Sequence, residues 1–284
     1  MNEAEIFIAG ANGQLGKALR ARYPNANFAD IDRLDITEEE SIKNYDWSQT
    51  RIILNAAAYT NVDGAETAEG RIEAWKVNAH AVGYLSKVAR DNDITILHIS
   101  TDYVFDGTQD NHKEEEAFAP LSVYGASKAA GDIIVSLTPK FYILRTSWVI
   151  GEGRNFVRTM LELGKKGVDP TVVSDQIGRL TFTSELVRAI DHLLSNNLSF
   201  GTYNISNSGE SKSWADITKT IFEIAGYQNS VNTITTDDYY TGKENTAPRP
   251  LNSTLNLTKI QTTSFTSTDW RDELRLYIEK ELQS

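Results

Sequence analysis

The sequence predicts an α/β fold, a doubly wound parallel sheet with a smaller C-terminal lobe. Two observations predict it: short apolar runs alternate with helical patterns through the first 150 residues, and a glycine-rich turn follows the first run. Such alternation specifies right-handed βαβ units around a parallel sheet. The regularity weakens beyond Trp148. We therefore expect a core over residues 1–150 and a lobe over residues 151–284, with elements of the second part returning to the sheet.

Composition places the chain among ordinary globular proteins. Hydrophobic residues make up 40% of its 284 residues and charged residues 24%; no apolar run approaches the roughly 18 residues of a membrane span. The absence of cysteine excludes disulfides, thiolate metal sites and a cysteine nucleophile. The net charge of -11 disfavours binding to nucleic acid or an anionic membrane. The first residues resemble no secretory signal or transit peptide, so we expect a cytoplasmic protein.

The first predicted strand, Ile6-Phe7-Ile8-Ala9, leads directly into a glycine turn and a helix. Gly10 permits the sharp turn, Gly13 lets backbone approach a pyrophosphate at the helix N-terminus, and Gly16 allows helix and strand to pack closely. The strand–turn–helix order is the context that a phosphate-binding turn requires. The sequence therefore predicts a dinucleotide-binding core of the Rossmann type.

The second predicted strand, residues 27–32, ends in acidic residues. Asp30 and Asp32 favour NAD, because a carboxylate there accepts from the adenosine ribose and repels a 2′-phosphate; Arg33 could attract that phosphate. NADH and NADPH both remain open. A capping box, Thr37-x-x-Glu40, predicts that a helix begins at Thr37.

Polar and small residues follow the next two predicted strands. Residues 51–54 lead into Asn55-Ala56-Ala57-Ala58-Tyr59, and residues 94–99 lead into Ser100-Thr101. A helical pattern joins them from Asp63 to Asp91, with Asn78 inside it. Because parallel strands bring their carboxyl ends to one edge, we expect the glycine turn, Asn55 and Thr101 to lie together.

A tyrosine and a lysine stand four residues apart in Tyr124-Gly125-Ala126-Ser127-Lys128. On a helix, positions i and i+4 share a face, so the two side chains can act together. A neighbouring cation favours phenolate, which predicts a lowered pKa for Tyr124 and a general-acid role. A polar loop at residues 106–116, predicted to lie at the surface, precedes this helix, and a strand at residues 141–144 follows it.

The second half mixes helices and short strands. Helices are predicted near residues 156–164, 185–194 and 214–225 and after Trp270. Strands are predicted at residues 171–173 and 202–205, and residues 237–250 are predicted to form a polar loop bearing Arg249.

Taken together, the glycine turn, Asn55-Ala56-Ala57-Ala58, Ser100-Thr101-Asp102 and the Tyr124–Lys128 pair resemble extended short-chain dehydrogenases/reductases. Further runs resemble the dTDP-4-dehydrorhamnose reductase family over nearly the whole chain: residues 34–37, 100–107, 145–149, 175–178 and 249–253. In that family, NADPH or NADH reduces the C4 ketone of dTDP-4-dehydro-6-deoxy-L-mannose to dTDP-L-rhamnose, a precursor of surface polysaccharides.

The resemblance implies a role for each matching residue. Tyr124 would protonate the C4 oxygen, Lys128 would lower the pKa of Tyr124 and bind the nicotinamide ribose, and Thr101 would donate to the same oxygen. The substrate would contact Thr101, Tyr103, Tyr124, Trp148, Asn155 and Arg249, the last through the pyrophosphate. The cofactor would contact Gly10, Asn12, Gly13, Gln14, Leu15, Gly16, Asp32, Arg33, Asp35, Ile36, Ala56, Ala57, Ala58, Tyr59, Tyr124 and Lys128.

The chain also departs from the family pattern. Leu180 stands where proline is common, which leaves the shape of that substrate-side loop open, and Ala18 stands where some members carry a magnesium-binding carboxylate. The four histidines (His80, His98, His112 and His192) lack ligand spacing. We therefore expect no metal, and both a monomer and a homodimer remain open.

Two other functions remain to be weighed. A related nucleotide-sugar dehydratase or epimerase would share the Tyr124–Lys128 pair, but dehydratases need Thr-Asp-Glu, and here Tyr103 follows Thr101-Asp102. A non-catalytic regulatory subunit would keep the fold and the dinucleotide pocket, but the intact Thr101, Tyr124 and Lys128 argue against it.

Overall fold

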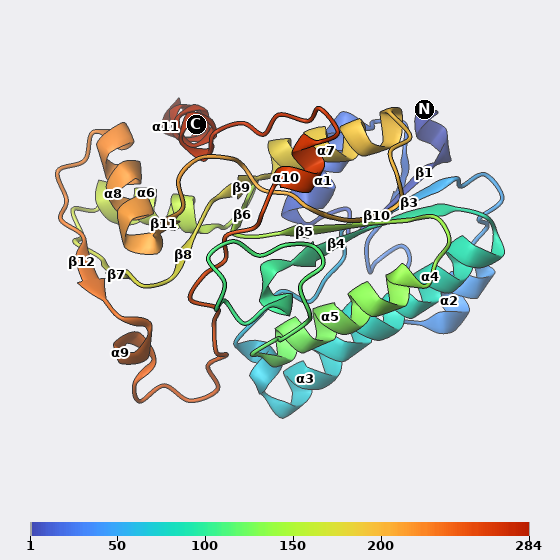
Figure 1. Cartoon of the computed structure of the whole chain (residues 1–284), viewed down its shortest axis with the longest axis horizontal. Helices are drawn as coiled ribbons and strands as arrows, with labels where there is room; N and C mark the ends of the chain where they lie inside the picture. The colour runs from blue at the N-terminus through green and yellow to red at the C-terminus, as the bar shows by residue number, and fades with distance from the viewer. Residues whose placement is uncertain (1, 284) are drawn as a thin grey trace.

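A computed structural model describes residues 2–283 and has a six-stranded parallel sheet at its centre (Figure 1). The strand order is β10-β5-β4-β3-β1-β2. The strands are β1 (Ile6–Ala9), β2 (Asn27–Ala29), β3 (Ile52–Asn55), β4 (Thr95–Thr101), β5 (Phe141–Thr146) and β10 (Gly201–Asn204). The chain runs from β1 outward to β2 and then crosses to β3 on the other side of β1. Ligands of open α/β sheets bind at such a reversal, beyond the strand carboxyl ends.

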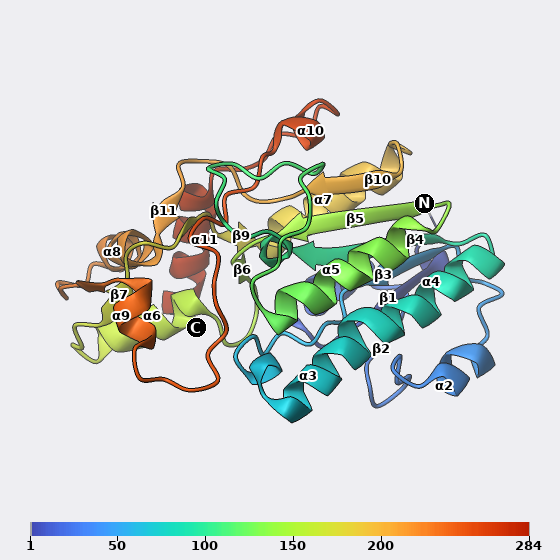
Figure 2. The ribbon, with the colours of Figure 1, turned by 60° about the horizontal axis from the view of Figure 1, so that its bottom comes forward.

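Helices cover both faces of the sheet (Figures 1 and 2). On one face α1 (Gln14–Arg22) packs beside α7 (Thr183–Ser195), and on the other lie α2 (Glu39–Asn44), α4 (Ala81–Asp91) and α5 (Val123–Ser136). Each face has its own apolar core, around Leu19 and Ile190 on the first and around Leu85 and Val135 on the second. The four inner strands, β5, β4, β3 and β1, are largely buried on both sides, as the centre of a parallel sheet requires.

The predicted helix over residues 63–91 is interrupted. The structure has a 3-10 turn at Gly64–Glu66, α3 (Ala68–Trp75), one π-helical turn at Lys76–His80, and then α4. Asn78 lies in the π turn. Its amide accepts from Tyr59 N at 2.9 Å and donates to Tyr59 O at 3.1 Å and to Ser127 Oγ at 3.0 Å. Asn78 thus ties the segment after β3 to α5.

The second half builds a lobe and also returns to the sheet. Helices α6 (Phe156–Lys165), α8 (Trp214–Ala225) and α11 (Trp270–Gln283) enclose a third apolar core. Three two-stranded pairs accompany them: β6 (Val149–Ile150) with β9 (Thr181–Phe182), β7 (Thr171–Val173) with β12 (Asn232–Ile234), and β8 (Ile177–Gly178) with β11 (Lys212–Ser213). Strand β10 pairs with β5, so this part of the chain completes the central sheet.

Two local predictions are corrected. Helix α2 begins at Glu39 and not at Thr37, because Asp35 Oδ1 accepts from both Thr37 N at 2.9 Å and Thr37 Oγ1 at 2.6 Å and holds Thr37 in a turn. The predicted polar loop at residues 237–250 contains most of a short helix, α9 (Thr236–Tyr240), capped by Thr235. A further short helix, α10 (Thr258–Gln261), was not predicted.

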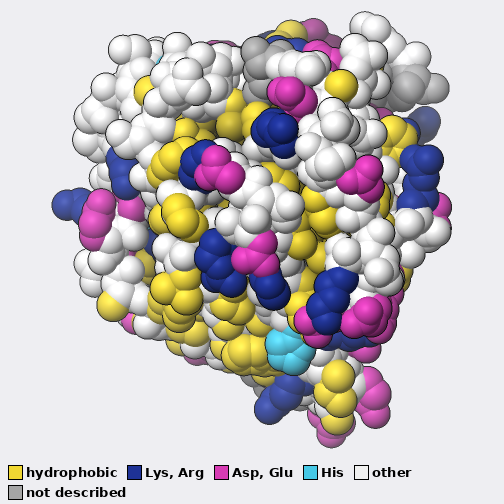
Figure 3. Space-filling view, turned by 90° about the vertical axis from the view of Figure 1, so that its right-hand side faces the viewer, with side chains coloured by type: hydrophobic (Ala, Val, Ile, Leu, Met, Phe, Trp, Pro, Cys, Tyr) yellow, Lys and Arg dark blue, Asp and Glu magenta, His cyan; other side chains and the backbone are white. Residues whose placement is uncertain are grey.

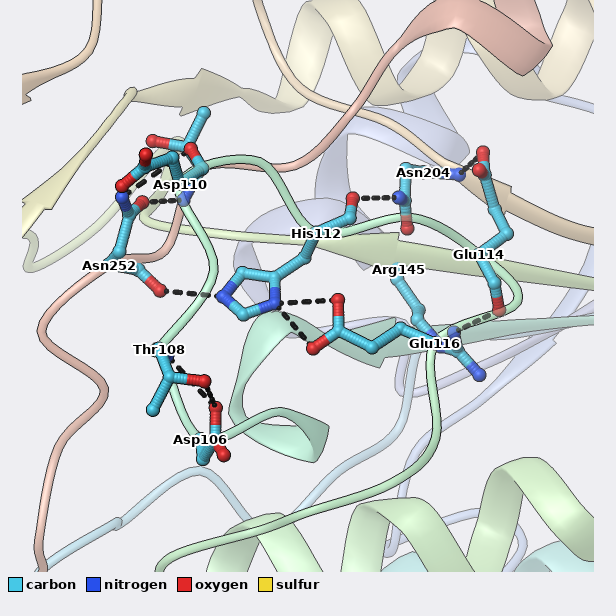
Figure 4. Close-up of polar contacts among 10 residues, drawn as sticks. Asp106, Thr108, Asp110, His112, Glu114, Glu116, Arg145, Asn204 and Asn252 are labelled. Carbon is cyan, nitrogen blue, oxygen red and sulfur yellow. Dashed lines mark hydrogen bonds and ion pairs between the residues drawn. The ribbon is translucent and has the colours of Figure 1, made fainter.

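The loop at residues 106–116 is not a simple surface loop (Figure 4). His112 and Glu114 are buried, and Glu114 Oε1 accepts from Asn204 N on β10 at 2.9 Å. Arg145 on β5 donates to Glu114 O at 2.9 Å and pairs with the buried carboxylate of Asp132 at 3.0 Å. Glu114 thus binds inward to β10 through its carboxylate and to β5 through its backbone carbonyl, which anchors the segment before α5. Short 3-10 helices lie at Glu3–Glu5 and, just before this loop, at Asp102–Val104.

Charges of both signs cover the surface. On the face in Figure 3, lysine and arginine side chains lie among aspartate, glutamate and apolar side chains, and neither sign dominates. None of the helices in residues 2–283 is long and apolar enough to cross a membrane.

Candidate active site

A cleft runs over the carboxyl edge of the sheet, in two cavities that share Gly13, Ala56 and Ala58. The first cavity, of about 330 Å³, lies beyond β1 and β2. The second, of about 430 Å³, lies beyond β4 and β5. The second cavity is lined by Gly13, Gln14, Leu15, Ala56, Ala58, Thr60, Val62, Ile99, Ser100, Thr101, Asp102, Tyr103, Tyr124, Lys128, Thr146, Ser147, Trp148, Val149 and Leu186. The continuous cleft therefore joins the glycine turn to the Tyr124–Lys128 pair.

The glycine turn has the shape that a dinucleotide phosphate needs. Gly10 has φ +75°, and a side chain there would lie 2.5 Å from Ala57 N; at Gly16 it would lie 2.0 Å from Gly10 O. Only glycine fits either position. Gly13 is the N-cap of α1, and no side chain caps the helix there. The first backbone N–H groups of α1 are thus free to bind an anion.

Two carboxylates line the first cavity, together with Ile36. Asp35 accepts from Thr37 through its Oδ1, and Asp30 is the first residue after β2. Asp32 and Arg33, expected at the cofactor, do not line the cavity, and the Arg33 guanidinium lies 5.2 Å from the Phe28 ring centroid. Among residues 2–283, no lysine or arginine lines this cavity. The sequence feature that points to Asp30 as a cavity residue is its position directly after the strand.

Helix α5 brings the tyrosine and the lysine into the second cavity. Its N-cap is Ser122, whose Oγ accepts from Gly125 N at 3.1 Å. Tyr124 is buried beside Thr101, with which its side chain forms a hydrogen bond, and the Tyr103 ring meets it edge-on at 5.6 Å. Lys128 is 1% exposed. Thr101, Tyr124 and Lys128 are thus brought together, although the sequence separates them.

The electrostatics differ from the sequence-based expectation. Burial raises the pKa of Tyr124 above its ordinary value, the hydrogen bond with Thr101 lowers it, and Asp102 and Asp132 raise it. Lys128 does not offset the effect of burial on the pKa of Tyr124, because its Nζ is directed at β4, where it donates to Ile99 O at 2.7 Å. Burial lowers the pKa of Lys128 to about 8, against the charge of Asp132. The expected lowering of the Tyr124 pKa by Lys128 is therefore not present in this structure.

Trp148 forms one wall of the second cavity. Its backbone is in the left-handed region, with φ +48°, and its ring stacks on Trp214 with centroids 3.7 Å apart and planes at 17°. A side chain at Gly178 would lie 2.9 Å from the Trp148 ring. The ring is thus clamped between β8 and α8. This clamp could not be predicted from the sequence, because Gly178 and Trp214 are distant from Trp148 along the chain.

Several predicted contacts lie outside these two cavities. Asn155 caps α6: its Oδ1 accepts from Arg158 N at 3.1 Å and its Nδ2 donates to Gly151 O at 2.8 Å. Arg249 lines a separate cavity of about 470 Å³ and forms a fork on Asp63, with N–O distances of 2.7 and 2.8 Å.

The remaining predicted residues have structural contacts. Asn12 N donates to Asp30, and Tyr59 N donates to Asn78. Leu180, which left the shape of its loop open, is fully buried in the apolar core of the lobe. Within residues 2–283, no group of three or more His, Asp or Glu side chains could hold a metal ion.

Comparison with known proteins gives consistent similarities. A family model described as "RmlD substrate binding domain" matches residues 4–283. The chain is 39% identical to a dTDP-4-dehydrorhamnose reductase of Aggregatibacter actinomycetemcomitans, covering 96% of this chain and 97% of the relative. It is 34% identical to the spore coat polysaccharide biosynthesis protein SpsK of Bacillus subtilis, covering 97% of each.

Solved structures agree with the sequence relatives. A dTDP-4-dehydrorhamnose reductase of Clostridium acetobutylicum superposes with a TM-score of 0.89 at 35% identity, covering 98% of this chain and 99% of the other. The Bacillus anthracis enzyme of the same name, solved in complex with NADP, gives a TM-score of 0.88 at 34% identity, covering 97% and 98%.

Proposed function

The chain belongs to the RmlD substrate binding domain family, and on this premise we propose that it reduces the C4 ketone of dTDP-4-dehydro-6-deoxy-L-mannose to dTDP-L-rhamnose. NADPH or NADH is the reductant. One observation carries the proposal: Thr101, Tyr124 and Lys128 line a single cavity that continues to an uncapped helix N-terminus behind a glycine turn. Carbonyl reduction requires a hydride donor and a proton donor at the same C=O group, and a dinucleotide that lies along this cleft would bring its nicotinamide end to Tyr124.

The residues of the glycine turn fit the dinucleotide. Backbone N–H groups at the start of α1 bind the pyrophosphate, and Asp30, Asp35 and Ile36 surround the adenosine ribose. Residues 56–58 supply small side chains at the end of β3, where the cofactor crosses the sheet edge. The bound nicotinamide supplies the hydride.

Tyr124 and Thr101 handle the proton. Tyr124 donates its phenolic proton to the C4 oxygen as hydride reaches C4, so that the C=O π pair becomes the new O–H bond and the phenolate remains on Tyr124. The Thr101 hydroxyl, which donates to Asp102 Oδ1 at 3.0 Å in this structure, turns to donate to the same C4 oxygen and fixes the ketone beside Tyr124. The raised pKa of Tyr124 keeps it protonated, and hence a donor, before the hydride arrives.

Trp148 and Arg249 hold the nucleotide sugar. The clamped Trp148 ring gives the sugar an apolar wall in the cavity that Tyr103 and Tyr124 also line. Arg249 already forms a fork on Asp63 in this structure, so it binds the pyrophosphate either through its remaining N–H groups or in exchange for that carboxylate. Asn155 acts by holding the start of α6.

The proposal includes the setting of the enzyme. It acts in the cytoplasm on a small-molecule nucleotide sugar, as a monomer or homodimer, without nucleic acid, membrane or metal. The test mixes the purified protein with the 4-keto sugar nucleotide and NADPH or NADH and follows absorbance of the reduced cofactor. We expect oxidation that depends on the sugar nucleotide. No oxidation with either cofactor would refute the proposal.

A further inference from the structure

A buried polar chain lies behind Lys128. Lys128 Nζ is 3.2 Å from His98 Nε2, and His98 Nδ1 is 3.1 Å from Asn55 Nδ2. His98 and Asn55 are fully buried neighbours on β4 and β3. Neither His98 nor Asn55 has a role in the proposed reductase mechanism. A buried histidine in contact with the active-site lysine nevertheless affects which protonation state that lysine adopts.

The hydrogen bonds fix which ring nitrogen of His98 carries the proton. Ala57 N donates to Asn55 Oδ1 at 3.2 Å, so the amide of Asn55 directs its NH₂ group at His98. That group can only donate, so His98 Nδ1 must accept. Burial and the charge of Lys128 hold the pKa of His98 well below its ordinary value, which keeps the ring neutral. A neutral ring that accepts at Nδ1 carries its proton on Nε2.

The Nε2–H group of His98 therefore faces Lys128 Nζ. An ammonium has three donors and no lone pair, so in the charged form of Lys128 two donors oppose each other across this contact. The neutral amine has a lone pair, which accepts from His98 Nε2 while one amine N–H remains on Ile99 O. The contact favours the amine.

We propose that Asn55 and His98 are positioning residues that lock the Nε2–H tautomer against Lys128 and make its ammonium a ready proton donor. The catalytic part of this inference rests on the proposed function. After Tyr124 has protonated the C4 oxygen, an N–H bond of the Lys128 ammonium breaks and its proton passes through a water molecule, in the cavity that both side chains line, to the phenolate of Tyr124. His98 Nε2–H then donates to the new lone pair, and Lys128 later regains a proton from solvent.

Other charged groups face Lys128 from the elements around it. Asp132, one turn further along α5, favours the ammonium, but its carboxylate is paired with Arg145 on β5. Asp102 and Tyr124 border the same cavity. The two pKa values are consistent with the proposed roles, since burial keeps His98 neutral and holds Lys128 near 8, within reach of working pH.

The tautomer is tested directly by long-range nitrogen NMR on the protein labelled with ¹⁵N-histidine, without substrate. The His98 signals are identified by their loss in His98→Gln. We expect a neutral ring protonated on Nε2 across neutral pH. In Asn55→Asp, where a carboxylate accepts from both Ala57 N and the ring, the proton should move to Nδ1. A wild-type ring protonated on Nδ1, or on both nitrogens, would overturn the inference whatever the activity assay shows.

The catalytic part is tested by the pH profile of ketone reduction. Wild-type activity should fall at alkaline pH as Lys128 loses its proton near pH 8. In His98→Gln the side-chain amide can turn its oxygen to the ammonium of Lys128 and stabilise it. The midpoint of this fall, the pH at which half of the activity is lost, should therefore rise by about one pH unit. His192→Gln, a matched change at the half-buried histidine of α7, should leave the midpoint in place. An unmoved midpoint in a folded, cofactor-binding His98→Gln protein would overturn the catalytic role.

Discussion

The carboxylate of Asp30 accepts the backbone N–H of Asn12 at 2.8 Å, which ties the end of β2 to the glycine turn after β1. Its other oxygen accepts from Ile31 N at 2.8 Å. Both oxygens are thereby held at the wall of the first cavity, so the negative charge cannot turn away from a bound ribose. A 2′-phosphate bound at this point would meet the fixed negative charge of Asp30. No lysine or arginine among residues 2–283 lines the cavity to offset the repulsion.

The first prediction concerns cofactor choice. Asp30→Asn keeps an oxygen for Asn12 N and removes the charge. The ratio of kcat/KM for NADPH to that for NADH should therefore rise by roughly tenfold or more, since two charges about 4 Å apart interact by about 1 kcal/mol in water and about 4 kcal/mol near a protein surface. Asp32→Asn is the matched control, because Asp32 does not line the cavity, and its ratio should equal that of the wild type. If the ratio changed for Asp32→Asn alone, Asp32 and not Asp30 would be the residue that contacts the ribose.

The second prediction concerns the proton donor. Tyr124→Phe removes one oxygen from a buried ring and should lower kcat by about 10²-fold or more, the scale of a general acid. Tyr103→Phe makes the same change on the ring 5.6 Å away and should keep most of kcat. Steady-state kinetics with both substrates and cofactor titration of each variant separate chemistry from binding. Comparable losses in the two variants would remove the special role of Tyr124.

The third prediction concerns the tryptophan clamp. Trp214→Ala leaves Trp148 stacked on one side only, and aromatic pairs contribute about 0.5–1.5 kcal/mol. The KM for the nucleotide sugar should rise roughly 3- to 10-fold with a smaller change in kcat, while Trp214→Phe should recover most of the loss. Trp75→Ala, on α3 away from the cavity, serves as control. An unchanged KM in folded Trp214→Ala would show that Trp148 needs no support.

The fourth prediction concerns stability and pH. Burial raises the pKa of Asp102 from 3.8 to about 6. Below about pH 4, Asp102 is protonated in both the folded and the unfolded chain, so its titration does not affect stability. Between about pH 4 and pH 6, Asp102 ionises in the unfolded chain but stays protonated in the folded one. The folded state therefore loses stability as the pH rises through this range. The free energy of unfolding of Asp102→Asn, relative to the wild type, should therefore increase by roughly 2–3 kcal/mol from pH 4 to pH 7. Denaturant titrations at both pH values measure it, and a constant difference would contradict it.

The sequence was sufficient for the fold because its signals are local. The glycine turn, the apolar runs and the Tyr124–Lys128 spacing each depend on neighbours within a few residues, and the α/β fold and the reductase family follow from their order. The sequence left Asp30 and Asp32 as alternative ribose carboxylates, because strand ends cannot be placed to one residue from pattern alone; β2 ends at Ala29, and Asp30, not Asp32, lines the first cavity.

Contacts between distant segments could not be predicted. Arg249 binds Asp63 across 186 positions of sequence, and Trp148 meets Trp214 through the packing of the lobe. The direction of Lys128 is a third case. Helical spacing places it on the same face as Tyr124, but only the packing of α5 on β4 shows that Ile99 and His98 bind its Nζ.

The most direct test of the reductase function is isotope transfer. The protein is supplied with the 4-keto sugar nucleotide and with NADPH or NADH carrying deuterium at the transferable C4 position of the nicotinamide, and the product is examined by NMR and mass spectrometry. The proposed function predicts dTDP-L-rhamnose with one deuterium, bound to C4 of the sugar. Unchanged substrate, or a product with deuterium at another carbon, would contradict it.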